Sequence, residues 1–107
     1  MSVKPRIKVS EGAKAGDIIE IKTVIQHVME TGQRRDGSGN LVPRDIIHTF
    51  TATFGGQPVF KAEMQSGISA NPFIQFYMRA TTPGELLLVW EGDNNFRVEE
   101  KVPIALA

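Results

Sequence analysis

Apolar and polar residues alternate with a period of two along most of this chain. Residues 17–27 show the pattern most clearly, because one face carries β-branched side chains and the other carries charged and amide side chains. The residues of the β-branched face are Ile19, Ile21, Thr23 and Ile25. Such alternation is typical of a strand that is buried on one side and solvated on the other.

The same alternation recurs in six further segments. They are residues 46–54, 73–80, 85–91 and 96–104, with Arg6–Val9 and Pro58–Glu63 as two shorter candidates. Clusters of Gly, Pro and Asn separate the segments, and no window sustains an apolar period of 3.6 residues. About seven short strands with frequent turns predict an all-β fold, an immunoglobulin-like antiparallel β-sandwich formed by a single domain over residues 1–107. A small β-barrel remains the alternative.

One connection is unusually long and polar. Residues 30–45 carry three glycines and three arginines and lack the alternation of the strands. Loops of this length in compact domains tend to be functional, and the turn-forming pairs Asp36-Gly37 and Ser38-Gly39 also allow a small hairpin that projects from the sandwich. Arg34 and Arg35 are therefore candidate contacts for a partner, although a solvated loop tip is the simpler interpretation.

Two strands carry apolar residues on the face that should meet water. Phe73 and Tyr77 alternate with the inward residues of 73–80, and Leu87 and Val89 do the same in 85–91. Exposed aromatic and aliphatic residues on neighbouring segments favour a binding face for another protein or a second copy of the chain. Ordinary packing between side chains of paired strands would explain each pair equally well.

Composition excludes several classes of protein. Twelve basic residues balance twelve acidic ones, which argues against a dedicated nucleic-acid or membrane-surface protein. No apolar run approaches the ~20 residues of a membrane helix, and the basic N-terminus lacks the apolar region of a signal peptide. The absence of Cys removes thiolate metal centres and a thiol nucleophile, including the iron centre of a superoxide reductase, a redox enzyme known on this kind of fold.

The remaining chemistry-bearing residues are sparse. His27 and His48 have no second His or carboxylate at ligand spacing, so we expect structural or interface histidines and no metal site. Serines are available for a catalytic triad, but none stands in a Gly-x-Ser-x-Gly turn. Glu99 and Glu100 are adjacent in a strand and therefore point to opposite faces, where they cannot serve one substrate.

Several stretches resemble one known family. The sequence His27-Val-Met-Glu-Thr-Gly-Gln-Arg-Arg-Asp36 is the most specific, and others support it in the same order along nearly the whole chain. They are Arg6-Ile-Lys-Val9, Ala15-Gly-Asp-Ile-Ile-Glu-Ile-Lys-Thr23, Pro43-Arg-Asp-Ile-Ile-His-Thr-Phe-Thr51, Pro58-Val-Phe60 and Asn71-Pro-Phe-Ile-Gln-Phe76. On these residues the chain resembles SoxZ, the smaller subunit of the SoxYZ carrier of bacterial thiosulfate oxidation. Val28 departs from the proline typical of the family, which relaxes a backbone restraint without touching chemistry.

The resemblance implies a non-catalytic subunit without a cofactor. SoxZ proteins pair with SoxY, whose C-terminal arm carries the sulfur substrate on a cysteine, and help to present that arm to the cytochrome, hydrolase and sulfur dehydrogenase partners. Since SoxY-type subunits carry the export signal, the resemblance also implies a periplasmic location reached by co-export. Whether the isolated chain associates with itself through the face that SoxY would cover stays open.

The sequence-based hypothesis is therefore a partner subunit of a covalent sulfur carrier. Its expected partner-interface residues, inferred from exposure rather than from the family, are Arg34, Arg35, Phe73, Tyr77, Leu87 and Val89. A generic immunoglobulin-like module that binds protein or glycan is the alternative, and an independent enzyme is the third hypothesis.

Overall fold

The computed structural model describes residues 3–66, 68 and 70–107. Seven strands account for the regular structure of this part of the chain. They are β1 (Arg6–Val9), β2 (Ile18–Val24), β3 (Ile47–Phe54), β4 (Gln57–Glu63), β5 (Phe73–Arg79), β6 (Gly84–Gly92) and β7 (Arg97–Ile104). The described residues contain no helix that is long and apolar enough to cross a membrane.

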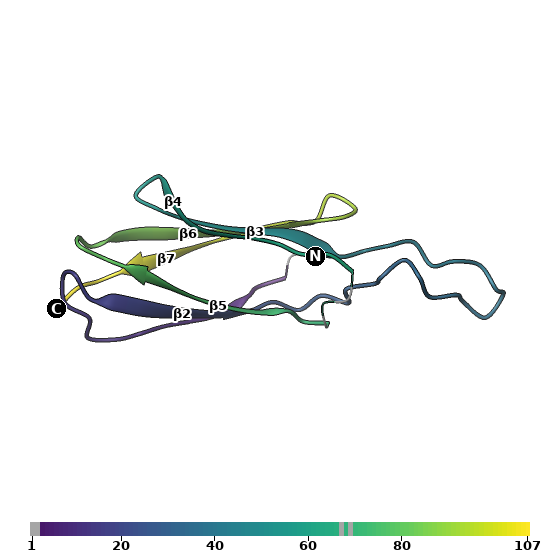
Figure 1. Cartoon of the computed structure of the whole chain (residues 1–107), viewed down its shortest axis with the longest axis horizontal. Coiled ribbons are helices and arrows are strands. Elements are labelled where there is room, and N and C mark those ends of the chain that lie inside the picture. The colour runs from purple at the N-terminus through teal and green to yellow at the C-terminus, as the bar shows by residue number, and fades with distance from the viewer. Residues whose placement is uncertain (1–2, 67, 69) are drawn as a thin grey trace.

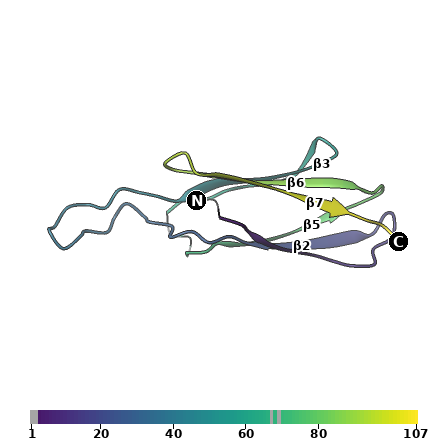
Figure 2. The same cartoon turned by 180° about the vertical axis from the view of Figure 1, so that it is seen from behind.

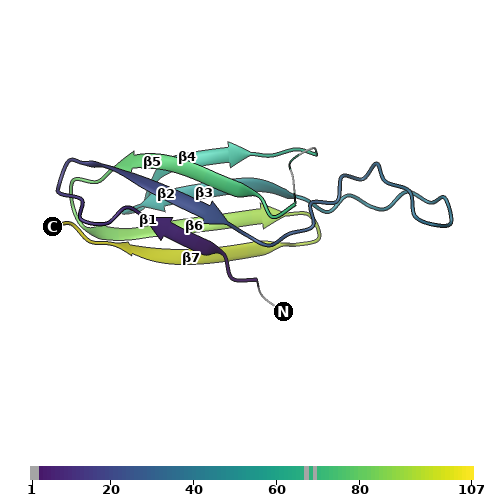
Figure 3. The same cartoon turned by 90° about the horizontal axis from the view of Figure 1, so that it is seen from below.

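The strands form two antiparallel sheets that face each other (Figure 1). One sheet has the order β1-β2-β5, and the other has the order β4-β3-β6-β7. The view from below shows the two layers superposed, with β1 and β5 as the edges of the smaller sheet (Figure 3). This arrangement confirms the predicted all-β sandwich, and each of the seven predicted segments contains a strand.

The core lies between the sheets and is built from the inward side of each alternation. Ile19 and Ile21 of β2 and Leu86 and Leu88 of β6 are fully buried, as the pattern of the sequence predicts. Phe50 and Trp90 pack with ring centroids 5.0 Å apart at the centre. Burial of apolar surface of this kind is the main force that holds such a sandwich together.

The alternation breaks at the start of β3. Ile46 and Ile47 are consecutive residues, yet both are fully buried. A shift of register between Ile47 and Thr49, where β3 pairs with β6, lets two neighbouring side chains turn toward the core. The bulge lies close to the point where the chain returns from the long connection of residues 30–45.

Residues 30–45 extend well beyond one end of the sandwich, while the C-terminus lies at the opposite end (Figure 2). We call this segment the arm. It makes the molecule elongated, with principal dimensions of 58 × 21 × 20 Å. The two legs of the arm run side by side, which confirms the projecting hairpin that the turn-forming pairs allowed.

Candidate interaction surfaces

Two bridges connect the legs of the arm. At its root, Glu30 and Asp45 exchange two backbone hydrogen bonds of 2.8 Å. Further out, Arg35 pairs with Leu41. Asp36 closes the tip, because its carboxylate accepts hydrogen bonds from the backbone N–H groups of Ser38 and Asn40. These contacts give the arm a defined shape, although it has no core of its own.

The root of the arm is fixed to the sandwich by two residues of the stretch most characteristic of the family. The backbone N–H of Met29 donates to His27 Nδ1 at 3.0 Å, which leaves the proton of a neutral ring on Nε2, 3.6 Å from an Asp45 carboxylate oxygen. The His27 ring also packs edge-on against Phe96, with centroids 4.8 Å apart. Met29 is buried, and its sulfur accepts a hydrogen bond from the Ile47 N–H at 3.3 Å.

A second attachment joins the other leg to the β6–β7 turn. The Arg44 guanidinium donates two hydrogen bonds of 2.8 Å to the two carboxylate oxygens of Asp93. This bidentate contact lowers the pKa of Asp93 below its usual value and raises the pKa of Arg44. Gly32 makes room for the leg, because its φ is +85° and a Cβ there would lie 2.9 Å from the Arg44 Cβ.

The two arginines predicted as contacts differ in their surroundings. Arg34 donates from Nε and Nη2 to one Glu30 oxygen, at 3.0 and 2.8 Å, and this hydrogen bonding lowers the pKa of Glu30. Arg35 makes no ion pair within the described part of the chain, and its Nη1 donates to the Gly39 carbonyl at 2.7 Å. Arg34 therefore stabilises the arm, whereas Arg35 presents its charge near the tip.

Phe73 and Tyr77 lie on the outer face of the β1-β2-β5 sheet, and each is 59% exposed. Tyr77 stands opposite Glu20 of β2, and its hydroxyl donates to the Glu20 carboxylate at 3.0 Å. This hydrogen bond is the main reason why the pKa of Glu20 is lowered and that of Tyr77 is raised. Phe73 stands opposite Val24 at the end of β5 nearest the arm.

The expectation that Leu87 and Val89 extend this apolar face is wrong. β5 and β6 follow one another in the sequence but belong to different sheets, so the two outward pairs lie on opposite sides of the sandwich. Val89 is only 7% exposed, because β6 is a central strand and places Val89 between Thr51 of β3 and Glu99 of β7. Leu87 is half-buried in the same way. Whether any of these residues contacts a partner stays a prediction.

The other polar residues considered above are dispersed. His48 is half-buried and lies beside Thr49, with its Nδ1 2.8 Å from the threonine hydroxyl. Among the residues that the structure describes, no three His, Cys, Asp or Glu side chains gather as metal ligands would.

Sequence reasoning missed one surface. Arg6 and Lys8 of β1 point outward on the same side as Lys22 of β2, next to the exposed Phe73. The regular alternation of basic residues with Pro5, Ile7 and Val9 could have revealed it. On its own that alternation indicates only a strand, because the pairing of β1 with β2 brings Lys22 beside Lys8.

Solved structures with a similar fold place the chain in a broad class. A superoxide reductase (neelaredoxin) from Ignicoccus hospitalis matches with a TM-score of 0.70 and 14% identity, over 98% of this chain and 82% of that chain. A hypothetical protein from Pyrococcus horikoshii OT3 matches with a TM-score of 0.66 and 16% identity, over 94% and 87%. CHIR-AB1 matches with a TM-score of 0.58 and 12% identity, over 97% and 98%. At these identities the likeness defines a class of β-sandwich folds and nothing more.

The sequence identifies a specific family. Residues 7–103 match the family described as "Sulphur oxidation protein SoxZ", and the match takes in all seven strands in part or whole and the arm. The chain belongs to the SoxZ family, which gives it a role in sulfur oxidation. No curated protein matches the sequence.

Proposed function

We propose that this chain is a non-catalytic subunit of a SoxYZ-type carrier and pairs with a cysteine-bearing SoxY subunit. The observation that carries the proposal is the family match over nearly the whole chain. The chemistry of the chain is consistent with such a role. It has no Cys, so it brings no thiol that could exchange with a sulfur species held on the thiol of its partner.

The arm is the part of the molecule best suited to reach another protein. It projects beyond the sandwich, and its root is held by the His27–Met29 contact and the Arg44–Asp93 pair. A surface that is shaped before binding loses less conformational entropy on association. We infer that Arg35 and the exposed Phe73 contact SoxY or the cytochrome, hydrolase and sulfur dehydrogenase that act on the carrier. A periplasmic location, reached by export together with SoxY, belongs to the same proposal.

Co-purification with SoxY tests the pairing. Wild-type chain expressed with affinity-tagged SoxY is expected to elute as a stoichiometric complex. Arg35→Glu reverses an exposed charge near the tip of the arm, and Phe73→Asp places a charge on the exposed aromatic position. Lys101→Glu, on the outer face of the other sheet, is the matched surface control. Thiosulfate oxidation with the remaining Sox proteins then reports whether the complex still works.

The outcomes are distinct. Loss of the complex or of oxidation in one of the first two variants, but not in the control, supports the contacts. Full complex and full oxidation in both variants would place the contacts elsewhere and leave the pairing intact. Failure of the wild-type chain to bind SoxY would refute the pairing and favour the alternative of a generic immunoglobulin-like binding module.

A further inference from the structure

The outer face of the β1-β2-β5 sheet carries an excess of positive charge. The side chains that alternate outward on these strands include five charged ones. They are Arg6, Lys8, Glu20, Lys22 and Arg79. Four of the five are basic, and the strand register places Lys8, Lys22 and Gln75 in one row across the three strands. We call this surface the basic face.

The opposite outer face has a different character. The charged side chains that alternate outward on β4, β6 and β7 are nearly balanced, with three basic and four acidic residues. They are Lys61, Glu63, Glu85, Glu91, Arg97, Glu99 and Lys101. Several are paired with one another, since Lys61 contacts Glu63 and Arg97 contacts Glu91 and Glu99. The excess charge is therefore specific to one side of a chain with no net charge.

The basic face is not arranged for stability. Lys8 and Lys22 stand directly opposite each other on paired strands, a position in which like charges are destabilising. The single acidic residue, Glu20, already binds Tyr77 and Gln75 through one oxygen, and its other oxygen lies 3.4 Å from Lys22. Arg6 and Lys8 form no ion pair within the described residues. Glu20 thus offsets only part of the repulsion, and a local arrangement that costs stability is a common mark of a binding surface.

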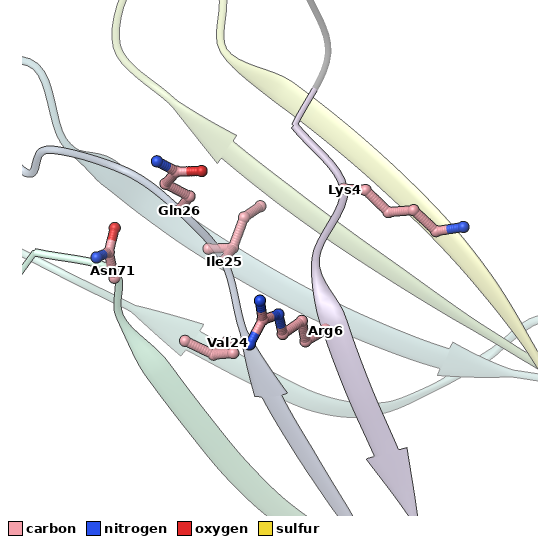
Figure 4. Close-up of a pocket in the computed structure, with 6 residues that line it drawn as sticks. All are labelled: Lys4, Arg6, Val24, Ile25, Gln26 and Asn71. Carbon is pink, nitrogen blue, oxygen red and sulfur yellow. The ribbon is translucent and has the colours of Figure 1, made fainter.

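The surface is also hollowed along β1. A cavity of about 340 Å³ is lined by Lys4, Arg6, Val24, Ile25, Gln26 and Asn71 (Figure 4). Its neighbour of about 230 Å³ shares Arg6 and includes Lys8, Lys22 and Phe73. In Figure 4 the Arg6 side chain lies across Val24 toward β2, while Lys4 points away from it. The two hollows combine basic side chains with the exposed ring of Phe73.

The spacing of the charges matches an extended polypeptide. Arg6 and Lys8 alternate along β1, and alternate residues of a strand are ~6.6 Å apart. An extended segment with an acidic residue at every second position repeats at the same interval. The apolar surface of Phe73 and Val24, beside Lys22, can accept an apolar side chain of the same segment.

From this match we propose that the basic face binds an extended acidic segment of a partner protein. Its carboxylates pair with Arg6, Lys8 and Lys22, and an apolar residue packs against Phe73. The proposal adds to the arm a second contact surface, which shares Phe73 with the contacts proposed above, and its test does not require SoxY. A nucleic acid is disfavoured because a chain without net charge would repel much of a long polyanion from its acidic side.

Peptide binding to the full chain provides the test. The probe is a fluorescein-labelled peptide of sequence Glu-Thr-Glu-Leu-Glu-Thr-Glu, measured by fluorescence anisotropy at low and at high salt. We expect saturable binding that weakens as salt is raised, because exposed charges are screened. The double variant Arg6→Glu/Lys8→Glu should lower the affinity by roughly tenfold or more. Phe73→Ala should lower it by a smaller factor and leave the salt dependence unchanged.

Controls separate this surface from general attraction. Lys61→Glu/Lys101→Glu makes the same change of charge on the opposite face and should leave the affinity within about twofold of wild type. A peptide with Gln in place of Glu should not bind. Equal loss in both double variants, or no binding of the acidic peptide at low salt, would overturn the proposal. So would equally tight binding of oligothymidine or of phosphatidylserine vesicles. Thermal melts establish that each variant is folded.

Discussion

Met29, at the root of the arm, has an unfavourable backbone conformation that its contacts stabilise. Its φ is +53°, a left-handed conformation that is unfavourable for a side chain of this size. The cost is offset by burial of the side chain and by two hydrogen bonds, one from its own N–H to His27 and one from the Ile47 N–H to its sulfur. Together these contacts attach the arm to the first residue of β3.

We expect Met29→Ala to destabilise the protein by about 2–5 kcal/mol, the usual cost of removing a large buried side chain. The loss includes a cavity in the core and an Ile47 N–H left without its acceptor. Chemical denaturation of the isolated chain measures the change. Val28→Ala is the control, because Val28 is 70% exposed and should change the stability by less than about 0.5 kcal/mol. If Met29→Ala left the free energy of unfolding unchanged, the arm would not depend on this contact.

The sequence predicts a structural or interface role for His27 and assigns none to Met29. The left-handed conformation of Met29 and the hydrogen bond from its N–H to His27 are properties of the local backbone, and no alternation of apolar and polar positions records them. Lone histidines in a strand pattern have several interpretations, and only the contacts with Asp45 and Phe96 identify His27 as a structural residue.

At the scale of elements, strand positions followed from the sequence while strand neighbours did not. Every predicted segment contains a strand, because alternation depends only on which side of a strand is buried. The order of the strands depends on where the chain crosses from one sheet to the other. An alternating pattern carries no information about those crossings. That is why Phe73 and Leu87, close in the sequence, lie on opposite faces. Lys8 and Lys22 meet through the register of β1 and β2, which alternation does not give either.

The attachment of the arm to the β6–β7 turn has a predictable dependence on pH. Hydrogen bonding to Arg44, helped by the Ile46 N–H, lowers the pKa of Asp93 in the folded state. A carboxyl group with a lowered folded-state pKa contributes stability at pH values above its unfolded pKa of about 3.9. That contribution is lost as the pH falls through the folded-state pKa, where the carboxylate becomes protonated.

Asp93→Asn should therefore lower the melting temperature at neutral pH and lose this effect in acid. Melting curves of the wild-type and variant proteins, recorded from pH 7 to about pH 2, should converge at the acid end. Glu63→Gln removes an exposed carboxylate that forms an ion pair with the exposed Lys61, and it should give a nearly constant, small difference. A difference for Asp93→Asn that does not change with pH would mean that charge is unimportant in this contact.

At the scale of the whole molecule, the arm makes the shape elongated but adds little to stability. The Cα radius of gyration is 16.2 Å, whereas a compact chain of this length should have about 13 Å. The buried apolar residues lie in the sandwich, and the arm joins that core through Met29 before it and Ile46 after it. An arm without a core costs chain entropy and adds little stability, which is reasonable only if its reach serves binding.

Shortening the arm tests whether the protein needs the arm for function but not for stability. Replacement of residues 35–41 by Asn-Gly would join Arg34 to Val42 through a two-residue hairpin turn, since the Val42 N–H already donates to the Arg34 carbonyl. The radius of gyration, measured by small-angle X-ray scattering, should fall toward the compact value, and the melting temperature should change by only a few degrees. Under the proposed function, thiosulfate oxidation with the other Sox proteins should be strongly reduced, because the shortened arm no longer projects toward the proposed partner. A variant that melts normally and still supports full oxidation would show that the tip of the arm has no part in assembly, and would leave the sandwich faces as the contact surfaces.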